Sequence, residues 1–217
     1  MKSISNIAII PARKNSKGLK FKNRLLFDYT RKFLNKINWF DKIIFASDDK
    51  YFVPKCKKSN YHFYDREKKN TLDNSSIKSL MLEISKNFNL NDETIIWLFY
   101  LTIPDRSLND FKKLKKITIK KNFSSALSFI PSKTHPYDCW IVKKKIKKFI
   151  KNDIYRRQDK IKLFEHHHYL CAFKIKELKE LNSELINSNT TPIILKKDII
   201  EIDTKEHLTR FINRKRI

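Results

Sequence analysis

Short apolar runs alternate with segments of helical periodicity along most of this 217-residue chain, and this alternation limits the fold more than any other feature. Short apolar runs predict buried strands, here at 6–10, 42–46, 61–64, 94–101 and 125–130. Apolar side chains that recur every three or four residues predict helices, here over 25–37, 77–88 and 108–119. The alternation predicts an α/β fold, with a mostly parallel, Rossmann-like sheet and helices on both faces.

Residues 132–165 interrupt this pattern, because they hold few long apolar runs and a lysine-rich stretch. We interpret them as an insertion that projects from the sheet as a dimerisation arm, within a single domain spanning residues 1–217. Beyond the insertion we expect strands at 169–173, 192–195 and 199–203, and helices at 174–185 and from Lys205. The candidate N-caps of the middle helices are Asp73 or Ser75 and the Ser107–Asp110 pair.

The net charge of +25 raises the question of a nucleic-acid partner. We discount it, because most of the 48 basic residues are lysines spread along the whole chain and the composition resembles that of an AT-rich genome. The charge should still attract small anions such as nucleotides. Three cysteines without a CxxC pattern favour a reduced, cytoplasmic chain. No apolar run approaches the roughly 20 residues of a membrane span, so we expect no membrane partner.

The chain has one glycine, Gly18, where ordinary composition would give about fifteen. It lies in a basic loop, residues 11–23, that follows the first predicted strand. Backbone N–H groups after a strand, one glycine and several cations suit a triphosphate, although the loop lacks Walker A spacing. We expect Gly18 to serve positive φ or close approach of a ligand. The residues alone favour a nucleotide site and a solvated basic loop equally.

Polar clusters follow three of the predicted strands: the basic loop, residues 47–49 and residues 104–106. Ligands of parallel α/β sheets bind at the carboxyl ends of the strands. Near the C-terminus, Glu201 and Asp203 stand two apart on a predicted strand, so both side chains should point to one face. Such a pair suits Mg²⁺, although a strand end that faces water is the commoner explanation.

Seven segments, in order, resemble the acylneuraminate cytidylyltransferase (CMP-sialic acid synthetase) family and cover nearly the whole chain. The first is the loop Pro11-Ala12-Arg13-x-x-Ser16-Lys17-Gly18-x-x-x-Lys22-Asn23. The others are Ser47-Asp48-Asp49, Arg66 with 71–76, Tyr100 to Arg106, His135-Pro136, Arg157-Gln158 and Ile200 to Thr204. One such match would be weak, whereas seven in order are specific to the family.

The resemblance implies a nucleotidyltransferase that joins CMP from CTP to an acidic sugar, releases pyrophosphate, needs Mg²⁺ and forms a homodimer. It assigns catalysis to Arg13, Lys22 and Asp203, and metal binding to Glu201 and Asp203. Substrate binding would fall to Ala12, Ser16, Gly18, Asn23, Arg66, Ser75, Tyr100, Arg106, Arg157, Gln158 and His168. Such chemistry depends on positioning and on cations that meet the phosphates, which these residue types supply.

The sequence departs from the family pattern mainly on the sugar side. Tyr100 replaces a glutamine and Ile103 replaces a small serine, while Glu201 replaces an aspartate. Because tyrosine offers one hydroxyl where glutamine offers two donors and an acceptor, a related nonulosonic acid is as good a candidate as sialic acid. The alternatives are a transferase for an octulosonate or another sugar, a non-catalytic nucleotide-binding protein, and a basic nucleic-acid-binding module.

Three consecutive histidines, 166–168, raise the question of a metal site. Successive side chains on a strand point to opposite faces, so all three cannot easily meet one ion. We expect His167 or His168 to contact substrate, or the run to be an ordinary strand start. We expect Cys171 in the core and the lysines of 143–148 on a solvated face.

Overall fold

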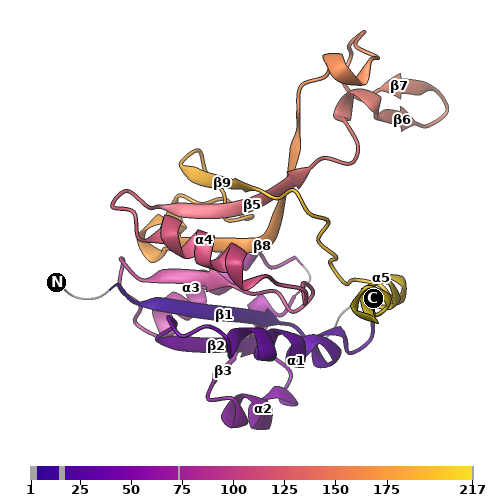
Figure 1. Ribbon diagram of the computed structural model, residues 1–217. Helices are drawn as coiled ribbons and strands as arrows, with labels where there is room; N and C mark the ends of the chain where they lie inside the picture. The colour runs from indigo at the N-terminus through magenta and orange to yellow at the C-terminus, as the bar shows by residue number, and fades with distance from the viewer. Residues whose placement is uncertain (1–3, 15–17, 73, 217) are drawn as a thin grey trace.

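The computed structural model describes residues 4–14, 18–72 and 74–216, and its centre is a seven-stranded sheet (Figure 1). The strand order is β3-β2-β1-β4-β8-β5-β9. The strands are β1 (Asn6–Ala12), β2 (Lys42–Ser47), β3 (His62–Asp65), β4 (Ile95–Leu98), β5 (Ser125–Pro131), β8 (Phe164–Lys174) and β9 (Thr190–Ile194). Only β8 runs antiparallel to its neighbours, β4 and β5. The predicted mostly parallel sheet is therefore confirmed.

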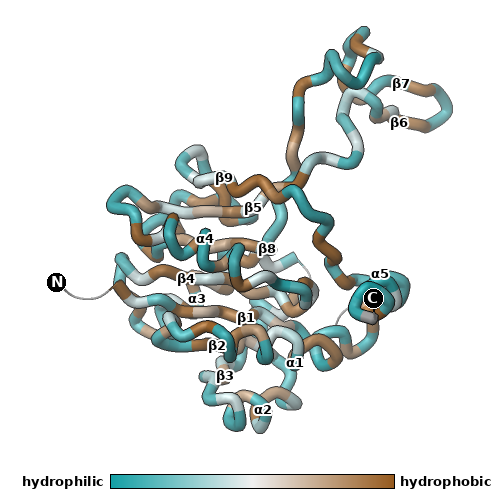
Figure 2. The backbone as a smooth tube through the Cα atoms, viewed as in Figure 1, coloured by the Kyte–Doolittle hydropathy of each residue, from teal (hydrophilic) through white to brown (hydrophobic). Residues whose placement is uncertain are grey.

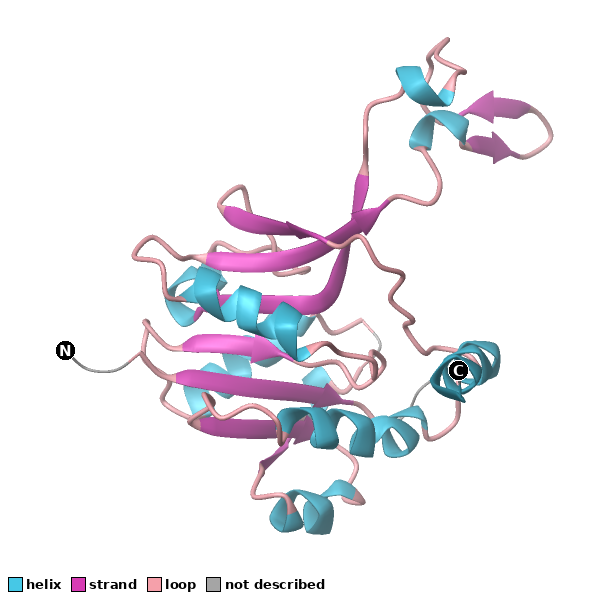
Figure 3. Ribbon diagram, in the orientation of Figure 1, coloured by secondary structure: helices cyan, strands magenta, loops and turns pink. Residues whose placement is uncertain are grey.

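Helices cover both faces of the sheet, as predicted (Figure 3). The α-helices are α1 (Lys22–Leu34), α2 (Phe52–Lys58), α3 (Ile77–Asn87), α4 (Leu108–Thr118) and α5 (Lys205–Arg216). The 3₁₀ helices are η1 (Lys68–Asn70), η2 (Pro136–Asp138), η3 (Arg157–Asp159) and η4 (Ile175–Lys179). Alternate residues of β1 divide between two cores: Ala8 and Ile10 pack in the core with α1 and α4, and Ile7 and Ile9 in the core with α3. Figure 2 shows the hydrophobic stretches along these strands.

Several local expectations were wrong. Ser76, rather than Asp73 or Ser75, caps α3, because its side chain accepts a hydrogen bond from Ser79 N at 3.1 Å; Asp73 lies outside the described residues. Ser107 precedes α4 without a side-chain cap, since Asp110 instead accepts hydrogen bonds from Tyr169 and Lys197. The short helix α2 was not predicted from the sequence, because only two of its residues, Phe52 and Cys56, are buried.

Two C-terminal elements also differ from expectation. The predicted helix at 174–185 is the 3₁₀ helix η4 followed by turns, and its buried residues Ile175, Leu178 and Leu181 recur at the three-residue period of that geometry. No strand forms at 199–203 in the described chain. That segment runs beside Thr102 and is held by the hydrogen bond from Ile202 N to Thr102 O (2.7 Å). Ile200 and Ile202 are nevertheless buried while Glu201 and Asp203 are exposed, so the predicted alternation of faces survives.

β1 continues through Pro11, where the sequence analysis ended it. The pairing of β1 with β4 stops at Ile9, and only β2 remains beside Pro11. A proline without an N–H group is tolerated where one side of a strand is unpaired. This extension carries the chain directly to Arg13 at the carboxyl end of the sheet.

The segment between β5 and β8 projects away from the sheet and carries a small hairpin (Figure 1). Its strands are β6 (Trp140–Val142) and β7 (Ile146–Lys148), which pair antiparallel. The lysines of 143–148 are exposed except for Lys148, which is partly buried. Across the described residues, no helix is both long enough and apolar enough to cross a membrane.

Candidate active site

A cavity of about 250 Å³ lies at the carboxyl ends of β1 and β4, where the strand order reverses. This is where ligands bind in open α/β sheets. Its walls come from the ends of β1 and β4, the start of α1, the segment after β3 and the start of α3. The lining residues are Pro11, Arg13, Lys22, Asn23, Arg66, Ser75, Ser76, Ile77, Tyr100 and Thr102. Six of the predicted site residues therefore meet in one cavity.

The basic loop is held over the sheet edge by contacts that use its own backbone. Asn23 Nδ2 donates to Arg13 O at 2.8 Å, and Lys14 N donates to Asp48 Oδ1 at 2.7 Å. Arg13 Nη1 donates to Leu72 O at 3.2 Å, which joins the loop to the wall before α3. Asn23 thus positions Arg13 in addition to lining the cavity. Ser16 lies outside the described residues.

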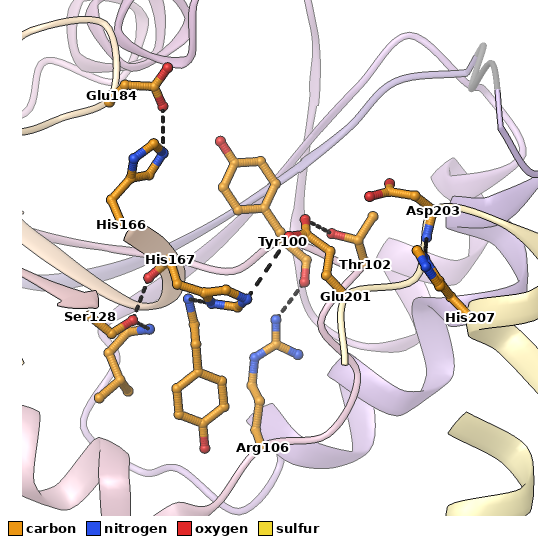
Figure 4. A network of polar contacts seen from close by, with 12 residues as sticks. Tyr100, Thr102, Arg106, Ser128, His166, His167, Glu184, Glu201, Asp203 and His207 are labelled. Carbon is orange, nitrogen blue, oxygen red and sulfur yellow. Dashed lines mark hydrogen bonds and ion pairs between the residues drawn. The ribbon is translucent and has the colours of Figure 1, made fainter. Parts of the chain in front are cut away.

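Lys22, Glu201 and Asp203 form a charged group beside Thr102. Figure 4 shows the two acids and Thr102. Lys22 Nζ lies 2.6 Å from Asp203 Oδ1, and Thr102 Oγ1 donates to Glu201 Oε1 at 3.1 Å. Although the Glu201 side chain is partly open to solvent, the protein around its carboxyl group displaces some of the water, and this desolvation and the neighbouring Asp203 carboxylate raise the pKa of Glu201. Two carboxylates that disfavour each other's charge gain from a shared cation, so this donor set fits the hard, oxygen-seeking Mg²⁺ ion.

Glycine is required at position 18 because the backbone of the basic loop passes close to the backbone of Asp203. A Cβ atom at this position would lie 2.2 Å from the carbonyl oxygen of Asp203. No described glycine has positive φ, so the expectation of positive φ at Gly18 is wrong. The close contact that Gly18 makes is with the backbone of residue 203 rather than with a ligand. The one glycine of the sequence thus lets the basic loop close on the segment that carries the two acids.

We expect Gly18→Ala to separate the basic loop from residue 203 and to lower the rate of whatever reaction this cavity carries out about a hundredfold, since a displacement of roughly 1 Å at an active site has that effect. The melting temperature should fall by only a few degrees, because the contact lies at the surface. Steady-state kinetics and thermal melting measure both effects. Lys20→Ala, an exposed change in the same loop, is the control, and equal losses in the two variants would contradict the role of this contact.

A buried carboxylate, Glu83 on α3, holds the Arg66 side of the cavity, and it was not among the residues predicted from the sequence. Glu83 accepts hydrogen bonds from Tyr64 Oη (2.7 Å), from Glu67 N (2.9 Å) and from Asn70 Nδ2. Asn70 in turn accepts from Arg66 Nη2 through its carbonyl oxygen. The signal was available, because Glu83 falls on the same helical face as Leu80 and Ile84.

Burial opposes the charge of Glu83, but the hydrogen bonds from Glu67, Asn70 and Tyr64 outweigh it and lower its pKa. The stabilisation is therefore present above the usual glutamate pKa and is lost as pH falls through the lower, folded value. We expect Glu83→Gln to lower the free energy of unfolding at pH 7 by about 1–3 kcal/mol. Urea unfolding measured from pH 7 to pH 3 should show that the difference in the free energy of unfolding between Glu83→Gln and wild type shrinks as the pH falls. A gap independent of pH would contradict an ionised Glu83.

Arg106 lies behind Tyr100 and outside the cavity lining. Its Nη2 donates to Tyr100 O at 2.5 Å (Figure 4), and its Nη1 donates to Thr30 Oγ1 at 3.1 Å. Burial lowers the pKa of Arg106 to about 9, and its guanidinium lies 5.4 Å from the ring centre of Phe99. This geometry makes Arg106 a support for the backbone of Tyr100, whose side chain lines the cavity.

The remaining predicted residues do not line this cavity. Ala12 is buried in the core, and His168 packs edge-to-face on Tyr100, with ring centres 5.3 Å apart. Burial is the main cause that lowers the pKa of His168 to about 4, and the nearby His166 contributes less. Arg157 and Gln158 lie in the projecting segment, where Arg157 borders a second cavity of about 540 Å³. Cys171 is in the core, as predicted.

No protein-family model matches this sequence, and no curated protein matches it either. Solved structures do match over nearly the whole chain. A CMP:2-keto-3-deoxy-manno-octonic acid synthetase complexed with CTP has a TM-score of 0.67 at 14% identity, covering 98% of this chain and 100% of that chain. A 4-diphosphocytidyl-2C-methyl-D-erythritol synthase from Anaerococcus prevotii has a TM-score of 0.62 at 13% identity, covering 99% and 97%.

A cytidylyltransferase from Leptospira borgpetersenii serovar Hardjo-bovis has a TM-score of 0.58 at 10% identity, covering 95% of this chain and 84% of that chain. At these identities the likeness establishes the fold alone. The chain has the α/β fold of these nucleotidyltransferases, which confirms the predicted fold class.

Proposed function

We propose that this protein is a Mg²⁺-dependent cytidylyltransferase that transfers CMP from CTP to an acidic sugar of the nonulosonic class. The observation that carries the proposal is the cavity, where Arg13, Lys22 and Arg66 line one space beside two acids. Cations at the carboxyl edge of such a sheet suit a triphosphate. The three structural neighbours support the same nucleotide, because they are a synthetase complexed with CTP, a diphosphocytidyl-methylerythritol synthase and a cytidylyltransferase.

In the proposed reaction a hydroxyl oxygen of the sugar acid bonds to the α-phosphorus of CTP. The bond from that phosphorus to the oxygen bridging to the β-phosphate breaks, pyrophosphate leaves, and the hydroxyl proton passes to solvent. Arg13, Lys22 and Arg66 stabilise the charge on the phosphates, because fixed cations need no reorganisation as charge develops. Glu201 and Asp203 would hold Mg²⁺, which when bound neutralises phosphate charge.

The sugar side of the site depends on Tyr100 more than on the other changed positions. Tyr100 lines the cavity, whereas Ile103 is 1% exposed and belongs to the core. The Tyr100 ring therefore carries the expected change in sugar preference. An eight-carbon octulosonate remains the second candidate, because the synthetase for 2-keto-3-deoxy-manno-octonic acid matches this chain over its full length.

We further propose that the projecting segment joins two copies of the chain, so that Arg157 and Gln158 act at a partner's site. Its apolar side chains are unusually exposed, among them Val142 (74%), Ile146 (69%) and Phe149 (61%). Contiguous exposed apolar surface typically marks an interaction site.

We expect the double variant Val142→Asp/Phe149→Asp to be monomeric by light scattering where the wild type is dimeric. Ile119→Asp changes an equally exposed apolar residue at the end of α4 (67% exposed) and should leave the dimer intact. A monomeric wild type, or a dimer that survives the double change, would contradict the proposed interface.

Calorimetric titration with CTP in the presence of Mg²⁺ tests the nucleotide assignment, with ATP, GTP and UTP as controls. We expect binding that prefers CTP and weakens in Arg66→Ala. A basic nucleic-acid-binding module instead predicts tight, steeply salt-dependent binding to DNA or RNA with no preference for CTP. That result would reject the proposal. Preferential CTP binding without turnover on any sugar would favour a non-catalytic nucleotide-binding protein.

A further inference from the structure

Two histidines and a glutamate that the proposed reaction does not use lie together beside Tyr100. His166 and His168 stand two apart on β8 and so share a face of the strand, and Glu184 approaches from the turns after η4. One ligand atom from each of the three lies within 4.8 Å of the others. The sequence analysis argued against an ion shared by all three consecutive histidines, and it gave no sign that Glu184 would join the first and third.

One pair of donors has nearly the spacing of a tetrahedral zinc site, and His168 has a ligand atom within 4.8 Å of donors from both other residues. His166 Nε2 lies 3.1 Å from Glu184 Oε2, and zinc–nitrogen bonds of 2.0–2.1 Å place neighbouring ligand atoms about 3.4 Å apart. The rings of His166 and His168 meet edge-to-face with centres 5.4 Å apart. His168 reaches the same group through a different atom of Glu184, its backbone carbonyl oxygen.

The ring of His168 is fixed in the way that metal-binding histidines usually are. Its Nε2 lies 3.2 Å from the carbonyl oxygen of Glu184, and its ring packs edge-to-face with the Tyr100 ring. A ring N–H that donates to a backbone carbonyl leaves the other nitrogen, Nδ1, with a lone pair for a metal. His166 and Glu184 are 41% and 50% exposed, so an ion can enter from solvent.

We propose that His166, His168 and Glu184 form a binding site for Zn²⁺ or a similar divalent transition metal. Two imidazoles and a carboxylate are a zinc donor set that leaves a fourth position for water or another oxygen. The site is separate from the Glu201–Asp203 pair, and the Tyr100 ring lies between that pair and the residues His166 and Glu184 in Figure 4. If the proposed function holds, the fourth position is near the side of the cavity that receives the sugar acid; the metal site itself does not depend on that function.

The test uses the full chain, stripped with EDTA and titrated with Co²⁺ by visible absorption and with Zn²⁺ against a chromogenic chelator. We expect one tight equivalent and a higher melting temperature with Zn²⁺. His166→Ala and Glu184→Gln, both at exposed positions, should each weaken binding at least about tenfold to a hundredfold. His62→Ala, at an exposed histidine on β3, is the matched control and should bind as wild type does.

Unchanged metal binding in both His166→Ala and Glu184→Gln would overturn the proposal, as would a wild-type chain that binds no Zn²⁺ at micromolar concentration. The CTP-induced shift in melting temperature, measured on the same variants, separates the two proposals. A retained CTP shift with no zinc binding in the wild type rejects the metal site alone. Zinc binding without a CTP shift rejects the nucleotide assignment and leaves the metal site standing.

Discussion

Lys22→Ala is expected to lower turnover with CTP about 10²–10³-fold, the usual effect of removing one group that stabilises charge in the transition state. Lys22 is the first residue of α1, and its side chain, which lines the cavity, is only 12% exposed. Its Nζ lies between the cavity and Asp203, where it would meet a phosphate. Steady-state kinetics should show the loss mainly in kcat, with CTP binding weakened less.

The fold should tolerate this change. Asp203 is 55% exposed, and ion pairs in that setting contribute at most about 1 kcal/mol. Lys22→Ala should therefore melt within a few degrees of wild type, while Lys20→Ala, which removes an exposed cation from the same loop, keeps full turnover. Wild-type turnover in Lys22→Ala would remove this residue from the catalytic group.

Asp203→Asn is expected to raise the Mg²⁺ concentration needed for half-maximal rate and to lower the rate at least about a hundredfold. The substitution preserves shape but removes the charge that a hard cation requires. It also relieves the electrostatic effect of Asp203 on Glu201, which contributes to the raised pKa of that carboxyl. A magnesium titration of the rate, with each variant at saturating CTP, measures both effects.

Asp198→Asn provides the matched control for Asp203→Asn. Asp198 is an equally exposed aspartate in the same segment, but its partner is Arg210 on α5. The Asp198→Asn variant should reach its half-maximal rate at the same Mg²⁺ concentration as wild type. An unchanged magnesium titration in Asp203→Asn, or equal changes in the two variants, would contradict a metal role for Asp203.

The sheet was predictable because its signals are local. Buried runs such as 42–46 and 125–130 are apolar on both faces, which fits strands covered by helices on both sides. The errors fall where tertiary contact replaced local pattern. The segment 199–203 has strand-like alternation yet pairs with no strand, and the three-residue period of η4 resembles an α-helix when only apolar residues are counted.

The site was predictable where motif residues themselves line the cavity, as Arg13, Lys22 and Tyr100 do. Supporting contacts between distant segments were not. The approach of Gly18 to the Asp203 carbonyl joins two ends of the chain, and the grouping of Glu184 with His166 depends on how η4 turns back toward β8. Such contacts carry no periodicity or spacing that one sequence can reveal.

Pyrophosphate release from CTP tests the central claim most directly. The assay combines the full chain, Mg²⁺ and a panel of nonulosonic and octulosonic acids, with ATP, GTP and UTP in parallel. We expect release that requires both CTP and one sugar acid, which would identify the acceptor in the same experiment. No release with any acceptor, together with no effect of CTP on the melting temperature, would contradict the assignment of this cavity to CTP.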